Sequence, residues 1–136
     1  MNVLIINGPN LNLLGVREPA IYGSQTMEDC LVDLAAKYQS ALISFYQSNV
    51  EGALIDRLQK DDFDAVVINP GAYTHYSFAI ADCLKNINKP KVEVHISNIY
   101  KREDFRKKSV TAEQCDAVLS GFGMLGYDLA LNFLLK

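Results

Sequence analysis

The sequence predicts an α/β protein whose parallel sheet is covered by helices on both faces. Short apolar runs rich in β-branched residues, as at residues 3–6 and 65–68, alternate with segments whose apolar residues recur at helical spacing. The run at 65–68 is apolar throughout, which is typical of a strand buried on both faces. Together these patterns favour a doubly wound sheet in a three-layer sandwich.

Local signals delimit each element in turn. Thr26 and Ser77 are plausible helix N-caps, and after Ser77 we expect Phe78, Ile80 and Leu84 to pack inward. The last helix is apolar nearly all round, which predicts that other protein largely covers it. Five strands of these lengths fit the flavodoxin-like order 2-1-3-4-5. The expected strands are residues 3–6, 41–46, 64–69, 91–97 and 117–119, and the expected helices lie within residues 26–39, 50–58, 77–88 and 124–136.

Length and composition suit one globular domain spanning residues 1–136, because 49% of the 136 residues are hydrophobic. The formal net charge of −3 gives no general attraction to nucleic acid or to an anionic membrane. No segment is long and apolar enough to span a bilayer, and the first apolar run is too short for a signal sequence. Three scattered cysteines fit a reducing cytosol, so we expect a soluble cytoplasmic protein.

The segment from residue 7 to residue 23 is expected to be a lid. Residues 7–10, Asn-Gly-Pro-Asn, break the first strand, and the following residues show no clean period. A loop of this length in a compact domain is usually functional or disordered, and its leucine residues favour order. We therefore expect the lid to carry Arg17 and Tyr22 over the end of the first strand.

Polar residues follow several expected strands at their carboxyl ends, where open parallel sheets bind ligands. Asn, Gly and Pro end many strands, but their presence at several ends together favours a site. Alternation along residues 91–97 also places Glu93, His95 and Ser97 on one face. Because buried polar groups without partners are costly, this face should meet a pocket or a subunit partner.

These residues can supply an acid and a base. A cation at Arg17 beside Tyr22 would stabilise the phenolate and lower its pKa from about 10, which makes a base. His95 can donate a proton. Such a pair suits proton abstraction beside a carbonyl and departure of water, although the residues alone name no substrate. Arg106 could pair with a substrate carboxylate, or it could belong to a solvated charged turn.

Other site chemistries find less support in the sequence. His75, His95 and Asp82 show no HxH or HExxH spacing, so no metal site is expected. There is no GxSxG nucleophile elbow. Residues 121–126 spell GxGxxG, but they follow the last expected strand, and we interpret these glycines as a tight turn with close helix packing.

Six blocks cover nearly the whole chain in order: NGPNLNLLG (7–15), REPAIYG (17–23), NPGAYTH (69–75), VEVHISN (92–98), REDFR (102–106) and GFGMLGY (121–127). Together they resemble the type II 3-dehydroquinate dehydratases. The resemblance implies a flavodoxin-like fold and a cofactor-free trans elimination of water from 3-dehydroquinate, through an enolate, to 3-dehydroshikimate. This step serves the shikimate pathway or quinate breakdown. The family also implies trimers grouped into a dodecamer.

The resemblance further implies roles for individual residues. Tyr22 as tyrosinate would remove the C2 proton, and Arg17 would favour its ionised form. His95 would protonate the departing hydroxyl, and Asn10 would help to hold a water that stabilises the enolate. The residues implied in substrate binding are Asn69, His75, Ile96, Ser97 and Arg106, together with Asp82, which would reach the site of a neighbouring subunit.

Departures from the family pattern lie beside these positions. Tyr76 stands where a small hydroxyl residue is usual, Tyr100 and Lys101 are bulkier than the common pattern, and Val110 replaces a frequent aromatic residue. They bear on affinity and subunit packing rather than on the chemistry. The rival hypothesis is a non-enzymatic flavodoxin-like module that binds a nucleotide, flavin or protein. It would need an acidic cluster or a phosphate-cradling loop after the first strand, and residues 7–10 are neither.

Overall fold

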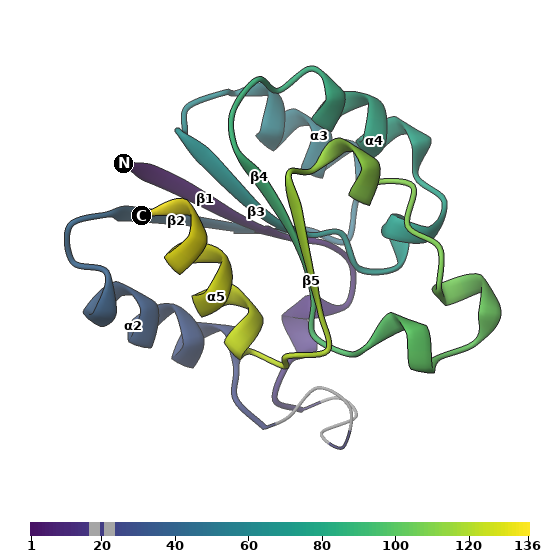
Figure 1. The fold of residues 1–136 in the computed structure, drawn as a ribbon, viewed down its shortest axis with the longest axis horizontal. Helices are drawn as coiled ribbons and strands as arrows, with labels where there is room; N and C mark the ends of the chain where they lie inside the picture. Colours follow the sequence, from purple (N-terminus) through teal and green to yellow (C-terminus); the bar gives the residue numbers. More distant parts are fainter. Residues whose placement is uncertain (17–19, 21–23) are drawn as a thin grey trace.

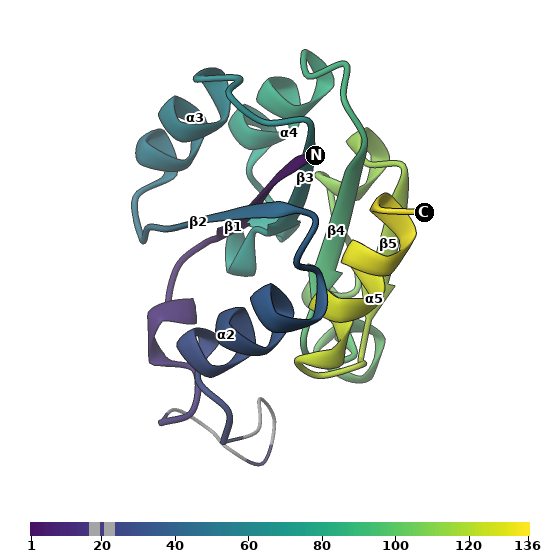
Figure 2. The same ribbon diagram turned by 90° about the vertical axis from the view of Figure 1, so that its left-hand side faces the viewer.

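A computed structural model describes residues 1–16, 20 and 24–136, and it contains a sheet of five parallel strands in the order β2-β1-β3-β4-β5. This arrangement confirms the predicted fold class. Figures 1 and 2 show the sheet between two layers of helices, with α2 and α5 on one face and α3 and α4 on the other. The strands are β1 (Asn2–Asn7), β2 (Leu42–Gln47), β3 (Ala65–Asn69), β4 (Lys91–His95) and β5 (Ala117–Ser120), and the helices are α2 (Met27–Lys37), α3 (Glu51–Gln59), α4 (Phe78–Lys85) and α5 (Leu125–Leu134).

Alternation along the central strand divides the core into two halves. Val3 and Ile5 pack with α2 and α5, whereas Leu4 and Ile6 pack with α3 and α4, and all four side chains are fully buried. Burial of one such side chain stabilises the fold by about 1.5–3 kcal/mol relative to exposure. The strand ends are therefore held firmly by core packing on both faces.

Helices α2 and α4 begin at the predicted caps, but one expected core residue of α4 does not pack inward. Thr26 Oγ1 accepts a hydrogen bond from the backbone N–H of Asp29 at 3.1 Å, within a capping box. Ser77 Oγ accepts one from the N–H of Ile80 at 3.0 Å. Phe78 is 66% exposed, because two residues correspond to about 200° around a helix and place it opposite the buried Ile80.

The final helix is covered mainly on the side that faces the sheet. Tyr127, Ala130 and Leu131 are fully buried, whereas Leu125 and Phe133 are more than half exposed. Among the described residues, most of the helix is thus covered, as expected, while these two apolar side chains are not. Among the residues that the structure describes, none of the helices has the length and apolar character of a membrane span.

Candidate active site

The carboxyl ends of β1, β3 and β4 surround a cavity of about 160 Å³. This is the sheet edge at which the polar strand ends predicted a site, and it follows from the parallel topology. The residues singled out from the sequence that line the cavity are Asn10, Asn69, His75, His95, Ile96, Ser97 and Arg106.

The other three predicted site residues are Asp82, Arg17 and Tyr22, of which the structure describes only Asp82. Asp82 is exposed on α4 and does not line the cavity. Arg17 and Tyr22, and with them the expected lid, lie outside the described residues. Within the described ranges, no group of three or more His, Cys, Asp or Glu side chains is arranged to hold a metal ion.

Arg102 also lines the cavity, although the sequence analysis did not select it. Arg102 lies four residues before Arg106 in the same basic segment, and this spacing was the sequence feature that could have indicated a second arginine at the site. The Arg106 Nε donates a hydrogen bond to Glu103 at 2.6 Å, and its terminal nitrogens have no hydrogen-bond partner among the described residues. Two guanidinium groups at one cavity suit a ligand that carries a carboxylate.

The turn after β1 crosses closely over the turn after β3. A Cβ atom at Gly8 would lie 2.3 Å from the carbonyl oxygen of Pro70, so no larger residue fits at this crossing. Beyond it, Asn10 has a φ of 68°, in the left-handed region that asparagine tolerates better than most residues. The Asn10 N–H donates to Oδ1 of Asn49 at 3.0 Å. These contacts place Asn10 on the cavity wall.

His95 is held by a carboxylate on its own strand. Its Nε2 lies 2.7 Å from Oε2 of Glu93, and both side chains are buried. Because a carboxylate only accepts, Nε2 carries the hydrogen, and Nδ1 is left for a ligand since it has no partner in the described part of the chain. If Nδ1 donates as well, the ring is an imidazolium, whose charge Glu93 compensates. The pair therefore suits proton donation into the cavity.

Three hydroxyl groups surround the carboxylate of Glu93. Its Oε2 accepts from Ser109 at 2.9 Å and from Thr74 at 3.3 Å, and its Oε1 accepts from Thr111. Burial alone raises the pKa of Glu93, but the hydrogen bond and charge of His95, with the bonds from Thr111 and Ser109, hold that pKa below its ordinary value. The polar face of β4 thus meets the cavity, as expected, and also a buried network of hydroxyl groups, which was not expected.

The low pKa of Glu93 predicts an acid-sensitive fold. The unfolded chain has a glutamate pKa of about 4.3, so between that value and the lower folded pKa the unfolded state binds more protons. The stability that Glu93 contributes is therefore present above about pH 4.3 and is lost as the pH falls through the folded pKa. Glu93→Gln should lower stability at pH 7 by about 1–3 kcal/mol and flatten the loss of stability in acid.

Thermal melts of the wild type and of Glu93→Gln between pH 7 and pH 3 measure this effect. Glu113→Gln is the matched control, because Glu113 is exposed and should leave the acid dependence unchanged. A Glu93→Gln protein whose melting temperature falls as steeply in acid as that of the wild type would contradict the prediction.

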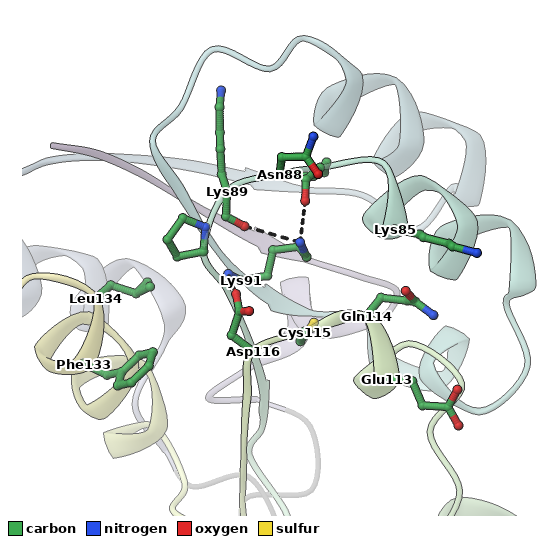
Figure 3. Close-up of a pocket in the computed structure, with 12 residues that line it drawn as sticks. Lys85, Asn88, Lys89, Lys91, Glu113, Gln114, Cys115, Asp116, Phe133 and Leu134 are labelled. Atoms are coloured by element: carbon green, nitrogen blue, oxygen red, sulfur yellow. Dashed lines mark hydrogen bonds between the residues drawn. The ribbon is translucent and has the colours of Figure 1, made fainter.

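A larger hollow of about 760 Å³ lies at the opposite edge of the sheet, by the first residues of β4 and β5. Figure 3 shows the Lys91 ammonium turned toward backbone carbonyl groups, and its Nζ donates to Ile87 at 2.5 Å and to Lys89 at 3.3 Å. The Lys91 N–H donates to Asp116 at 2.8 Å. These polar groups therefore already form hydrogen bonds with one another. Ligands bind beyond the carboxyl ends of the strands in such sheets, so the smaller cavity is the better candidate for the active site.

The GxGxxG segment has the structural role that the sequence analysis gave it. Gly121 has a φ of 94°, and Gly123 a φ of 61°, as a tight turn requires. A Cβ atom at Gly126 would lie 3.0 Å from Cγ1 of Val94, so the glycine lets α5 pack closely on β4. Tight turn and close helix packing are both confirmed.

Comparisons with known proteins agree with this geometry. A family model described as dehydroquinase class II matches residues 1–135. A 3-dehydroquinate dehydratase of Clostridium botulinum (strain Loch Maree / Type A3) is 56% identical, covering 99% of this chain and 95% of its own length. One of Thermotoga neapolitana is 54% identical, covering 100% and 95%. The crystal structure of type II dehydroquinase from Butyrivibrio crossotus matches with a TM-score of 0.94 at 46% identity, covering 100% of this chain and 98% of that chain. The chain belongs to the class II dehydroquinase family.

Proposed function

We propose that this protein catalyses the reversible trans dehydration of 3-dehydroquinate to 3-dehydroshikimate, with residues 1–136 as one catalytic domain. The observation that carries the proposal is the cavity where His95, backed by a buried carboxylate, faces the same space as two arginines. Membership of the family supports the substrate. Three free cysteines favour a reducing compartment, so we place the reaction in the cytoplasm, in the shikimate pathway or in quinate breakdown.

The chemistry needs one base and one acid, and the proposal assigns both to side chains without a cofactor. Tyr22, as tyrosinate, removes the C2 proton, and the electrons of that C–H bond form the enolate. Arg17 favours the ionised tyrosine, and Asn10 helps to hold a water that stabilises the enolate oxygen. When the enolate collapses, the C–O bond breaks and His95 protonates the departing hydroxyl, which leaves as water.

Substrate binding falls to the remaining cavity residues, Asn69, His75, Ile96, Ser97 and Arg106. His75 Nδ1 donates to the carbonyl oxygen of Lys108 at 2.7 Å, and Nε2, which has no partner among the described residues, can accept from a substrate hydroxyl. Burial lowers the pKa of His75 below its ordinary value, which keeps the ring neutral at pH 7. Arg106 is assigned to the carboxylate, with which a guanidinium pairs through two parallel hydrogen bonds.

The direct test is ultraviolet absorbance, because the product contains a conjugated enone and the substrate does not. We expect the purified protein to make enone from 3-dehydroquinate at a rate proportional to enzyme concentration. The rival module that binds a nucleotide, flavin or protein predicts folded protein and no enone, and bound flavin would colour it yellow. Folded protein that makes no enone would overturn the proposed function.

We also propose that the chain assembles into trimers grouped as a dodecamer, in which Asp82 of one copy reaches the cavity of another. Asp82 lies on the exposed side of α4 and does not line the cavity of its own chain. Nearby Tyr76 and Phe78 are 59% and 66% exposed. A neighbouring copy that covers these aromatic side chains would remove apolar surface from water and bring Asp82 to its site.

Sharing of sites between copies predicts complementation between two inactive variants. In an equimolar, randomly assembled mixture of Asp82→Asn and His95→Ala chains, about a quarter of the sites should combine an intact His95 with an intact neighbouring Asp82. We expect activity to return after the two proteins are unfolded and refolded together, and sedimentation should give the mass of the assembly. If sites are not shared, the mixture stays as inactive as its components.

A further inference from the structure

A buried chain of hydrogen bonds connects α5 to the wall of the cavity. The hydroxyl of Tyr127 lies 2.8 Å from Oδ1 of Asn7 and 3.1 Å from Nδ2 of Asn69. Tyr127 and Asn7 are 0% exposed, and Asn69 is 3% exposed. Of these three residues, Asn69 alone lines the cavity. A side chain in the helix layer is thus joined to a residue that the proposed function places on the substrate.

One backbone N–H shows which atom donates and which accepts in these hydrogen bonds. The N–H of Gly71 donates to Oδ1 of Asn69 at 3.1 Å, and because an amide N–H can only donate, the atom it meets must be the oxygen. The Asn69 Nδ2 therefore faces Tyr127 and donates to its hydroxyl oxygen. The hydroxyl proton is then free to be donated to Oδ1 of Asn7.

We infer that Tyr127 is a positioning residue, which holds Asn69 at the cavity as an N–H donor for an acceptor oxygen of the substrate. The second N–H of Asn69 Nδ2 has no acceptor among residues 1–16, 20 and 24–136, so it remains for a ligand. This inference rests on the proposed function for the identity of the substrate. Burial raises the pKa of Tyr127 far above its ordinary value, so the hydroxyl keeps its proton at any working pH.

A purely structural role explains the hydrogen bonds among Asn7, Tyr127 and Asn69 less well. Within the described part of the structure, Nδ2 of Asn7 is a buried polar atom without a hydrogen-bond partner. An unpartnered amide in the core is costly, and an apolar residue at position 7 would avoid that cost. The arrangement is understandable if Oδ1 of Asn7 is needed to fix the Tyr127 hydroxyl, which in turn fixes Asn69.

The test is Tyr127→Phe, which removes the hydroxyl and keeps the buried ring. We expect KM for 3-dehydroquinate to rise about tenfold, as for the loss of one well-placed hydrogen bond, while kcat changes by less than about twofold. Tyr38→Phe is the matched control. The Tyr38 hydroxyl donates a hydrogen bond at 2.5 Å to Asp128, which lies next to Tyr127 in α5 and does not line the cavity. The control should keep both constants.

A double-mutant cycle with Asn69→Ala separates positioning from general damage. If Tyr127 acts through Asn69, adding Tyr127→Phe to Asn69→Ala should change KM by less than about twofold, whereas additive losses would overturn the inference. Should Tyr127→Phe fail to fold, Asn7→Leu removes the acceptor for the same hydroxyl, and it should raise KM likewise. An inactive wild type contradicts the proposed function, whereas an active wild type with an unchanged Tyr127→Phe contradicts this inference alone.

Discussion

His95→Ala should lower kcat for 3-dehydroquinate by about 10²–10⁴-fold while the protein stays folded, the range over which a positioned general acid contributes. The hydroxyl of the substrate is a poor leaving group unless it is protonated as its bond breaks. His95 is suited to this because Nε2 is committed to Glu93 at 2.7 Å and only Nδ1 remains for the substrate. Alanine removes the proton donor and leaves the space to water.

The measurement is steady-state enone formation, with circular dichroism to establish folding. His75→Ala is the matched control, because His75 lines the same cavity but is assigned to binding, so KM should rise more than kcat falls. Folded His95→Ala with kcat near that of the wild type would remove His95 from the acid role.

Local sequence features account for most of what could be predicted of the fold. Apolar strand runs and capping residues are local signals, so the predictions of a sheet covered on both faces and of the caps at Thr26 and Ser77 were correct. The prediction that Phe78 packs inward was wrong, although it also relied on a local signal. Apolar character alone does not say on which side of a short helix a residue lies, and the angle relative to Ile80 decides it.

The candidate site was predictable where it is made of strand ends. Asn69 and His95 are the last residues of β3 and β4, Ser97 lies two residues beyond β4, and the parallel topology brings all three to one edge. The partners that hold these residues come from distant segments. Thr111 is 18 residues from Glu93, and Tyr127 is 58 residues from Asn69. No periodicity within one element indicates such pairs, so these networks appear only in three dimensions.

Tyr22→Phe should abolish most of the activity, again by about 10²–10⁴-fold in kcat, because a phenyl ring has no oxygen to take the C2 proton. Phenylalanine retains the aromatic ring and loses only the hydroxyl, so KM should change far less than kcat. Tyr46→Phe, on the edge strand β2 and away from the cavity, is the control and should keep the wild-type rate. Folded Tyr22→Phe that retains full kcat would exclude tyrosinate as the base.

The pH dependence then identifies what ionises Tyr22. In the proposed mechanism the base is the Tyr22 phenolate, so kcat/KM is expected to rise with pH as Tyr22 ionises in the free enzyme. The proposed role of Arg17 is to favour the phenolate by its charge, and Arg17→Gln removes that charge, so the rising limb should move toward the ordinary tyrosine value of about 10. A variant that is slower at every pH by the same factor would show instead that Arg17 only binds substrate. The direction of the shift therefore separates the two roles of the cation, which a single rate at neutral pH cannot do.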